Sequence, residues 1–129
     1  MKLDMHDMCF ACGRENPIGL RLEFAFDGDE YVTRLAVRPE HQGWRGVIHG
    51  GLLATAMDET MARLLWERKI NAITGRLEVR FHKPVSVGQR LAIRARITRD
   101  RPPVVETTAQ ARREDGALVA EARAVSMRV

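Results

Sequence analysis

The sequence predicts an α+β fold in which an antiparallel sheet of about five or six strands wraps around one long central helix. Most segments between turn signals alternate apolar and polar residues with a period of two, as half-buried strands do. One segment is instead apolar almost all the way round, as a buried helix is. Two strands, this helix and then four strands, all joined by short links, favour antiparallel neighbours.

The predicted strands lie between turns marked by Gly, Pro, Asn and Asp. Six are expected, at about residues 20–26, 31–38, 76–82, 90–97, 103–113 and 117–128. The last one places Leu118, Ala120, Ala122 and Ala124 on one face, and side chains this small let another element approach closely. Exposed edges of such a sheet favour pairing between copies, so we expect a homodimer, which could pair again into a tetramer.

The predicted helix covers residues 50–67. Its apolar side chains point in nearly every direction, which indicates that it is wrapped by the rest of the chain. They are Leu52, Leu53, Ala54, Ala56, Met57, Met61, Ala62, Leu64, Leu65 and Trp66.

Composition limits the class of protein. The 129 residues suit a single domain, 1–129, in which residues 1–19 form an N-terminal segment with two cysteines. A net charge of +4 without a basic block argues against a nucleic-acid partner, and no apolar run is long enough to cross a membrane. The first residues resemble neither a secretory signal nor a transit peptide, so we expect a cytoplasmic location.

Asp58 is unusual because it interrupts an apolar helix. A carboxylate in apolar surroundings costs several kcal/mol unless it is paired or its pKa moves. Its helical neighbours at positions 54, 55, 61 and 62 include no cation. A solvated position is the alternative. For Glu59 that alternative is favoured, with an ion pair to Arg63 one turn later.

The helix begins at His49-Gly50-Gly51. A helix N-terminus offers unpaired N–H groups, and glycines let a ligand atom approach the backbone closely, so Gly50 and Gly51 could hold a developing oxyanion. A plain helix start is the alternative. Gly50 and Asp58 are eight residues apart, about 12 Å along a helix, so one carbonyl cannot touch both. If both act on one substrate, they come from different subunits of a two-fold dimer.

These residues resemble the hotdog-fold acyl-CoA thioesterases, especially the branch typified by phenylacetyl-CoA and 4-hydroxybenzoyl-CoA thioesterases. The resemblance rests on His-Gly-Gly followed after six residues by Asp, on the stretch 74–85, and on the opening Cys9-Phe10-Ala11-Cys12-Gly13 with Asn16-Pro17. It implies thioester hydrolysis with Asp58 as nucleophile or general base, Gly50 as N–H donor and His49 holding the turn. No cofactor is expected, since CoA is part of the substrate.

The resemblance also implies further site residues. Thr74 falls where relatives place a Ser or Thr near the attacking water, and His41 and Gln42 fall near a position that contacts the thioester. Scattered cations would bind the CoA nucleotide, and the candidates are Arg80, Lys83, Arg94 and Arg96, each of which could equally be an ordinary solvated side chain.

Cys9 and Cys12 form a C-x-x-C pair with no second pair to complete a four-ligand zinc site. His6 or His41 could complete one only through folding or assembly. We therefore expect metal-free structural thiols, with zinc binding second and a redox disulfide third.

Three other functions are compatible with parts of this sequence. A hotdog hydratase or dehydratase would act on acyl thioesters with a His and an acid, although that His usually lies in another motif. A non-catalytic acyl-CoA-binding module would keep the helix terminus but would have no need of Asp58. A small zinc-dependent interaction protein would rest on the cysteines alone.

Overall fold

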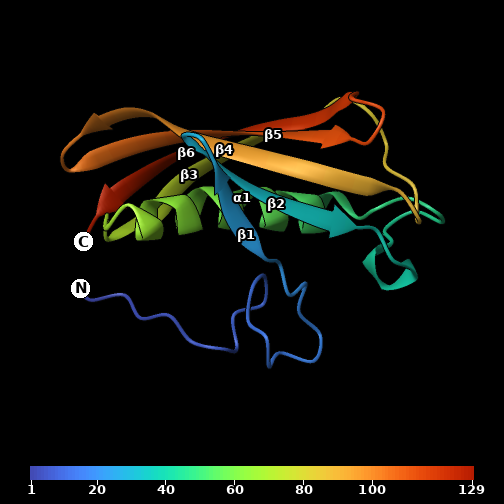
Figure 1. Cartoon of the computed structure of the whole chain (residues 1–129), viewed down its shortest axis with the longest axis horizontal. Coiled ribbons are helices and arrows are strands. Elements are labelled where there is room, and N and C mark those ends of the chain that lie inside the picture. Colours follow the sequence, from blue (N-terminus) through green and yellow to red (C-terminus); the bar gives the residue numbers. More distant parts are fainter.

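A computed structural model describes the whole chain, residues 1–129. Six strands form one antiparallel sheet in the order β1-β2-β4-β5-β6-β3, and one long helix packs against it (Figure 1). The elements are β1 (Phe24–Asp27), β2 (Glu30–Ala36), a 3-10 turn (Pro39–His41), α1 (Gly50–Glu67), β3 (Ala72–Phe81), β4 (Arg90–Arg101), β5 (Val104–Arg113) and β6 (Leu118–Arg128). The predicted strand count and the helix bounds are confirmed. The helix α1 lacks the combination of length and apolarity that crossing a membrane requires.

The core lies between α1 and the inner face of the sheet. The helix contributes seven buried residues, among them Met57, Met61 and Leu64. Opposite them lie small side chains of β5 and β6, including Ala109, Ala122 and Ala124. Ala122 and Ala124 are buried on the same face of β6, as their alternation in the sequence predicted.

The helix is covered on two sides by different parts of the chain. The sheet lies over one side, and the N-terminal segment, residues 1–23, runs along the opposite side (Figure 1). Between the sheet and the N-terminal segment, one strip of the α1 surface remains partly exposed. It includes Gly51, Ala54 and Asp58. The expectation of a fully wrapped helix is therefore only partly met within one chain.

The first strand is shorter than predicted. It begins at Phe24 rather than near residue 20, although Leu20 and Leu22 are buried as their alternation suggested. Their N–H groups donate to the carbonyls of Phe10 and Ala11, both at 2.9 Å, so the N-terminal segment takes the backbone bonds that a strand would use. Arg21 between them has a φ of +52°, which no strand residue adopts.

The prediction for Glu59 is wrong in detail. Its carboxylate does not pair with Arg63; it accepts a hydrogen bond from the Cys9 thiol at 2.9 Å. Arg63 pairs with Glu67 at 3.3 Å and donates to the Cys12 sulfur at 3.4 Å. The N-terminal segment competes for these side chains, an effect that helical spacing alone does not reveal.

The two edges of the sheet differ in length. β1 has four residues, whereas β3 has ten and pairs on one side only, with β6. Ile73, Leu77 and Phe81 of β3 are all more than a third exposed. A long edge strand that carries exposed apolar side chains is suited to pairing with another chain.

Candidate functional site at the start and middle of the helix

His49 caps the start of α1. Its Nδ1 accepts a hydrogen bond from the Gly51 N–H at 2.9 Å, and its carbonyl accepts from Leu52 and Leu53. The ring is held between glycines, because a Cβ on Gly43 or Gly51 would lie only 3.0–3.3 Å from His49 atoms. The turn therefore has the fixed geometry that a binding backbone needs.

Gly50 keeps a free N–H. As the first residue of α1 it has no acceptor within the helix, and it donates to no side chain and no loop carbonyl. The positive end of the helix dipole adds to this donor. The arrangement suits an oxygen that carries partial negative charge.

An apolar cavity of about 810 Å³ opens beside this donor. Gly50 and Gly51 form part of its wall, and Trp44 and Phe81 supply aromatic rings. The remaining lining residues are Gly43, Ile48, His49, Ala54, Leu77 and Val79. A mostly apolar cavity with one oriented polar group is typical of a small-molecule site.

Asp58 lies two turns further along α1 and is partly buried. Its Oδ1 accepts a hydrogen bond from the Thr74 hydroxyl at 3.1 Å, so the structure brings together these two predicted residues. Burial raises the pKa of Asp58 above its ordinary value, the Thr74 hydroxyl lowers it, and the charge of Glu59 raises it. No cation offsets the burial, as the helical neighbours indicated. An acid in this state is suited to proton transfer.

A bulge in β3 directs Thr74 toward the helix. The register with β6 shifts between Thr74 and Arg76, leaving Gly75 as an extra residue. Thr74 pairs with Ser126 and Leu77 with Ala124, and both partners are buried on the inner face. By simple alternation Thr74 would share the outer face of Arg76. The bulge reverses this and aims the hydroxyl at Asp58.

His41 and Gln42 are engaged within their own loop. The buried His41 ring accepts a hydrogen bond from the Arg38 N–H at 3.0 Å, and its carbonyl accepts from the His49 N–H at 2.8 Å. The Gln42 amide donates to the Pro39 carbonyl at 2.8 Å and accepts from the Gly46 N–H. Neither side chain lines the cavity beside Gly50; both support the loop that does.

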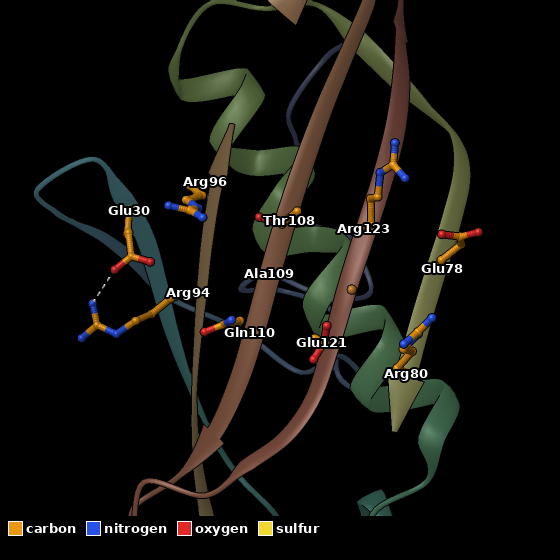
Figure 2. Close-up of a pocket in the computed structure, with 11 residues that line it drawn as sticks. Glu30, Glu78, Arg80, Arg94, Arg96, Thr108, Ala109, Gln110, Glu121 and Arg123 are labelled. Atoms are coloured by element: carbon orange, nitrogen blue, oxygen red, sulfur yellow. Dashed lines mark hydrogen bonds and ion pairs between the residues drawn. The ribbon is translucent and has the colours of Figure 1, made fainter. Parts of the chain in front are cut away.

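The predicted cations divide between the two faces of the sheet. Lys83 lines a smaller hollow of about 420 Å³ that shares Trp44, Gly50 and Phe81 with the cavity. Arg80, Arg94 and Arg96 instead line a groove on the outer face, with the helix behind the sheet (Figure 2). Arg94 is paired there with Asp27 at 2.8 Å and with Glu30 at 3.5 Å. Of the four predicted cations, only Lys83 lies near Gly50 of the same chain.

The aromatic walls of the cavity were not predicted. Trp44 is 87% exposed and Phe81 is 54% exposed, values that are unusual for such side chains. Trp44 lies in a loop without periodicity, so no pattern identified it. Phe81 belongs to the predicted strand 76–82, where alternation places it on the apolar face with Leu77 and Val79; its position at an exposed edge depends on the strand order. Gly75 lies just before the predicted strand 76–82, whereas β3 begins at Ala72, so the glycine that marks the bulge fell outside the predicted strand.

Comparisons with known proteins agree with this fold. The Thioesterase superfamily profile matches residues 45–120, from the loop before α1 into β6. Human acyl-coenzyme A thioesterase 13 is 27% identical over 95 residues, which cover 71% of this chain and 68% of that protein. A solved thioesterase superfamily protein superposes with a TM-score of 0.86 at 20% identity, covering 93% of this chain and 62% of that one.

A further solved structure is a hypothetical thioesterase from Streptococcus pneumoniae with coenzyme A. It has a TM-score of 0.79 at 16% identity and covers 84% of this chain and 85% of that one. These structural likenesses show the hotdog fold, a curved antiparallel sheet around one helix. Since the family profile matches well over half of the chain, the protein belongs to the thioesterase superfamily. Thioester hydrolysis is the reaction class that this membership assigns to it.

Proposed function

We propose that the protein hydrolyses an acyl-CoA thioester, with Asp58 of one subunit and the Gly50 N–H of the other acting on the same carbonyl group. The observation that carries the proposal is the pairing of two features of α1. One is a free N–H beside an apolar cavity, and the other is a partly buried carboxylate with a hydroxyl partner. A thioester is already activated, so a carboxylate and an oxyanion donor can suffice without a serine triad.

A dimer brings the two features together. Gly50 and Asp58 lie in one helix, about 12 Å apart by helical rise. Each chain therefore supplies Gly50 to one site of the dimer and Asp58 to the other. The ten-residue edge of β3, with its exposed apolar side chains, is the surface proposed for pairing. Thr74 and the cavity residues Leu77, Val79 and Phe81 all belong to β3, so pairing there would place the second copy beside the site.

In the proposed reaction the thioester carbonyl oxygen accepts the Gly50 hydrogen bond, which stabilises the negative charge that develops on it. Asp58 then either takes a proton from the attacking water or attacks the carbonyl carbon itself. The C–S bond breaks, the CoA thiolate leaves and takes up a proton, and the acid product forms. The nucleophilic route passes through an anhydride with Asp58 that water hydrolyses. Neither route requires a cofactor.

The substrate class follows from the cavity and from the relatives. Trp44, Phe81 and Leu77 would enclose an acyl group of medium length or an aryl group. The CoA moiety is proposed from the human acyl-coenzyme A thioesterase and from the streptococcal structure with coenzyme A. Lys83 is the cation best placed to meet a phosphate, because it shares a hollow with Gly50.

The test is release of free thiol from a panel of aliphatic and aryl acyl-CoAs by wild type and Asp58→Asn. We expect hydrolysis by wild type and a loss of about 10²–10⁴-fold in the variant, the usual contribution of an acid–base group. Glu67→Gln, an exposed carboxylate at the end of the same helix, is the matched control and should keep full activity. Undiminished turnover by Asp58→Asn would refute the assignment.

The shared site has its own experiment. Gly50→Pro removes the N–H, and the fold suits it, because proline is favoured at the first helical position and His49 is already extended with ψ 127°. Gly50→Ala is the control, since its Cβ would meet only Phe81 at 3.5 Å and the N–H remains. Heterodimers of Asp58→Asn with Gly50→Pro contain one intact site and should recover about half of wild-type activity. Inactive heterodimers would contradict a shared site.

A further inference from the structure

The two cysteines meet a third potential metal ligand where the N-terminal segment crosses α1. Cys9 Sγ lies 2.9 Å from Glu59 Oε2, and the ligand atoms of Cys9, Cys12 and Glu59 all lie within 4.8 Å of one another. The sequence alone offered only a C-x-x-C pair. The fold adds a carboxylate from a residue 50 positions away.

We propose that Cys9, Cys12 and Glu59 bind one divalent transition-metal ion of the zinc type, with solvent as the fourth ligand. In a tetrahedral site, metal–sulfur bonds of about 2.3 Å and metal–oxygen bonds of about 2.1 Å place neighbouring ligand atoms roughly 3.5–3.8 Å apart. The ligand atoms, all within 4.8 Å of one another, would reach this spacing by side-chain rotation, and the protons of both thiols would leave to solvent as the metal enters. Thiolate ligands favour soft or borderline ions such as Zn²⁺ over hard ions such as Mg²⁺ or Ca²⁺.

A bound divalent ion would offset most of the negative charge of the cluster. Two thiolates and a carboxylate carry three negative charges, and a divalent ion leaves one of these. Arg63 supplies a positive charge beside the cluster, because its Nη1 already lies 3.4 Å from Cys12 Sγ, while its Nη2 pairs with the exposed Glu67. All three ligand residues are partly buried, where an unbalanced charge would be costly. Arg63 would then hold the Cys12 sulfur by a hydrogen bond, as outer partners of metal ligands commonly do.

The backbone around the cysteines is fixed before any metal binds. Gly13 closes the turn by donating to the Cys9 carbonyl at 2.8 Å, and a Cβ on Gly13 would lie 2.5 Å from the Cys9 nitrogen. Between the cysteines, Ala11 is buried in the core. The two sulfurs are thus presented toward α1 by a rigid turn, which reduces the ordering cost of binding.

This cluster is separate from the thioester site. Successive residues of a helix point about 100° apart, so Asp58 faces Thr74 of β3 while Glu59 faces the N-terminal segment. A metal here would tie residues 1–23 to the helix that carries the proposed catalytic groups. Its expected role is structural, since no ligand contacts the cavity beside Gly50.

The experiment is titration of the reduced full-length protein with Co²⁺ in the absence of oxygen. We expect one equivalent per chain, with sulfur-to-cobalt charge-transfer bands in the near ultraviolet and visible bands of tetrahedral cobalt, all removed by Zn²⁺. The melting temperature should rise with added Zn²⁺, because the ion binds only the folded chain. Absence of these bands in protein with two free thiols per chain would overturn the proposal.

Two variants test the ligand set. Cys12→Ser should weaken cobalt binding by more than about 100-fold. Glu59→Gln should weaken it by at least about 10-fold and change the visible spectrum. The reason is that losing a metal ligand costs at least as much affinity as losing a hydrogen-bond partner of a ligand. Glu67→Gln, on the same helix and in contact with Arg63, should bind as wild type does. Circular dichroism checks that each variant is folded. Unchanged affinity in folded Glu59→Gln would overturn the three-ligand site.

Discussion

The Thr74 hydroxyl donates a hydrogen bond of 3.1 Å to the Asp58 carboxylate, and a single extra residue in β3 makes this contact possible. Thr74 and Asp58 are 16 residues apart on different elements. The bulge at Gly75 turns the threonine to the inner face of the sheet, where the helix lies. The pKa of the acid is therefore set jointly by burial, which raises it, and by a hydroxyl whose position depends on one glycine.

Thr74→Val should move the acid limb of the pH–activity profile to higher pH. The hydroxyl lowers the pKa of Asp58, so its removal raises that pKa, and the ionised carboxylate that the proposed reaction needs forms only at higher pH. Thr74→Ser keeps a hydroxyl and should retain the wild-type profile. The measurement is initial rate against pH at saturating acyl-CoA. An acid limb that stays in place in Thr74→Val would show that Asp58 does not control it.

Deletion of Gly75 should reduce activity at least as much as Thr74→Val. Without the extra residue, strict alternation resumes and Thr74 turns to the outer face, away from Asp58. Gly75→Ala is the control, because its Cβ would meet only the Val125 carbonyl at an ordinary 3.5 Å and the bulge can remain. Thiol release and circular dichroism are measured together. A folded deletion variant with full activity would contradict the role assigned to the bulge.

Asp58→Asn should raise the melting temperature at neutral pH. The pKa of Asp58 is higher in the folded state than its ordinary 3.8, so the group stabilises the fold below pH 3.8 and loses this contribution as pH rises through the folded pKa. At neutral pH the buried charge is a cost that asparagine removes. For a domain of this size about 1 kcal/mol corresponds to roughly 4 °C. The difference between the two proteins should disappear near pH 3, and a constant difference across pH would exclude this cause.

Leu77→Asp should weaken self-association. Leu77 is partly exposed near the middle of β3, the edge proposed for pairing, and a charge there opposes edge-to-edge contact. Ile18→Asp, at a 78% exposed position in the N-terminal segment, is the matched control. Analytical ultracentrifugation over a range of concentrations should give a lower mass for Leu77→Asp than for wild type or Ile18→Asp. Equal masses in all three would place the interface elsewhere.

His49→Ala should destabilise the fold by about 1 kcal/mol, the usual cost of losing a helix N-cap. The ring Nδ1 accepts from the Gly51 N–H, and alanine leaves that group without its partner. His49→Asn restores an acceptor of suitable length and should recover most of the loss. Urea unfolding gives the free energies of unfolding. Equal stability of the alanine and asparagine variants would show that the ring acts through packing between Gly43 and Gly51 instead.

Most elements could be predicted because their signals are local. Alternation along residues 90–97 and 117–128 and the apolar helix from Gly50 each need only neighbouring residues to be recognised. The exceptions involve partners distant in sequence. Residues 20–23 alternate like a strand but bond to residues 10 and 11, and Glu59 has a helical partner available but binds Cys9.

The sequence by itself determined the helix, the sheet, the acid at Asp58 and the glycine turn before it, together with the distance that separates them along one helix. These depend on residue type and spacing, which the chain carries directly. Only the tertiary structure decided which groups meet: Thr74 with Asp58 through the bulge, Glu59 with the cysteines, and Trp44 with Phe81 around the cavity. The physical reason is that such contacts depend on strand order and local register, both of which are settled by packing of the whole chain.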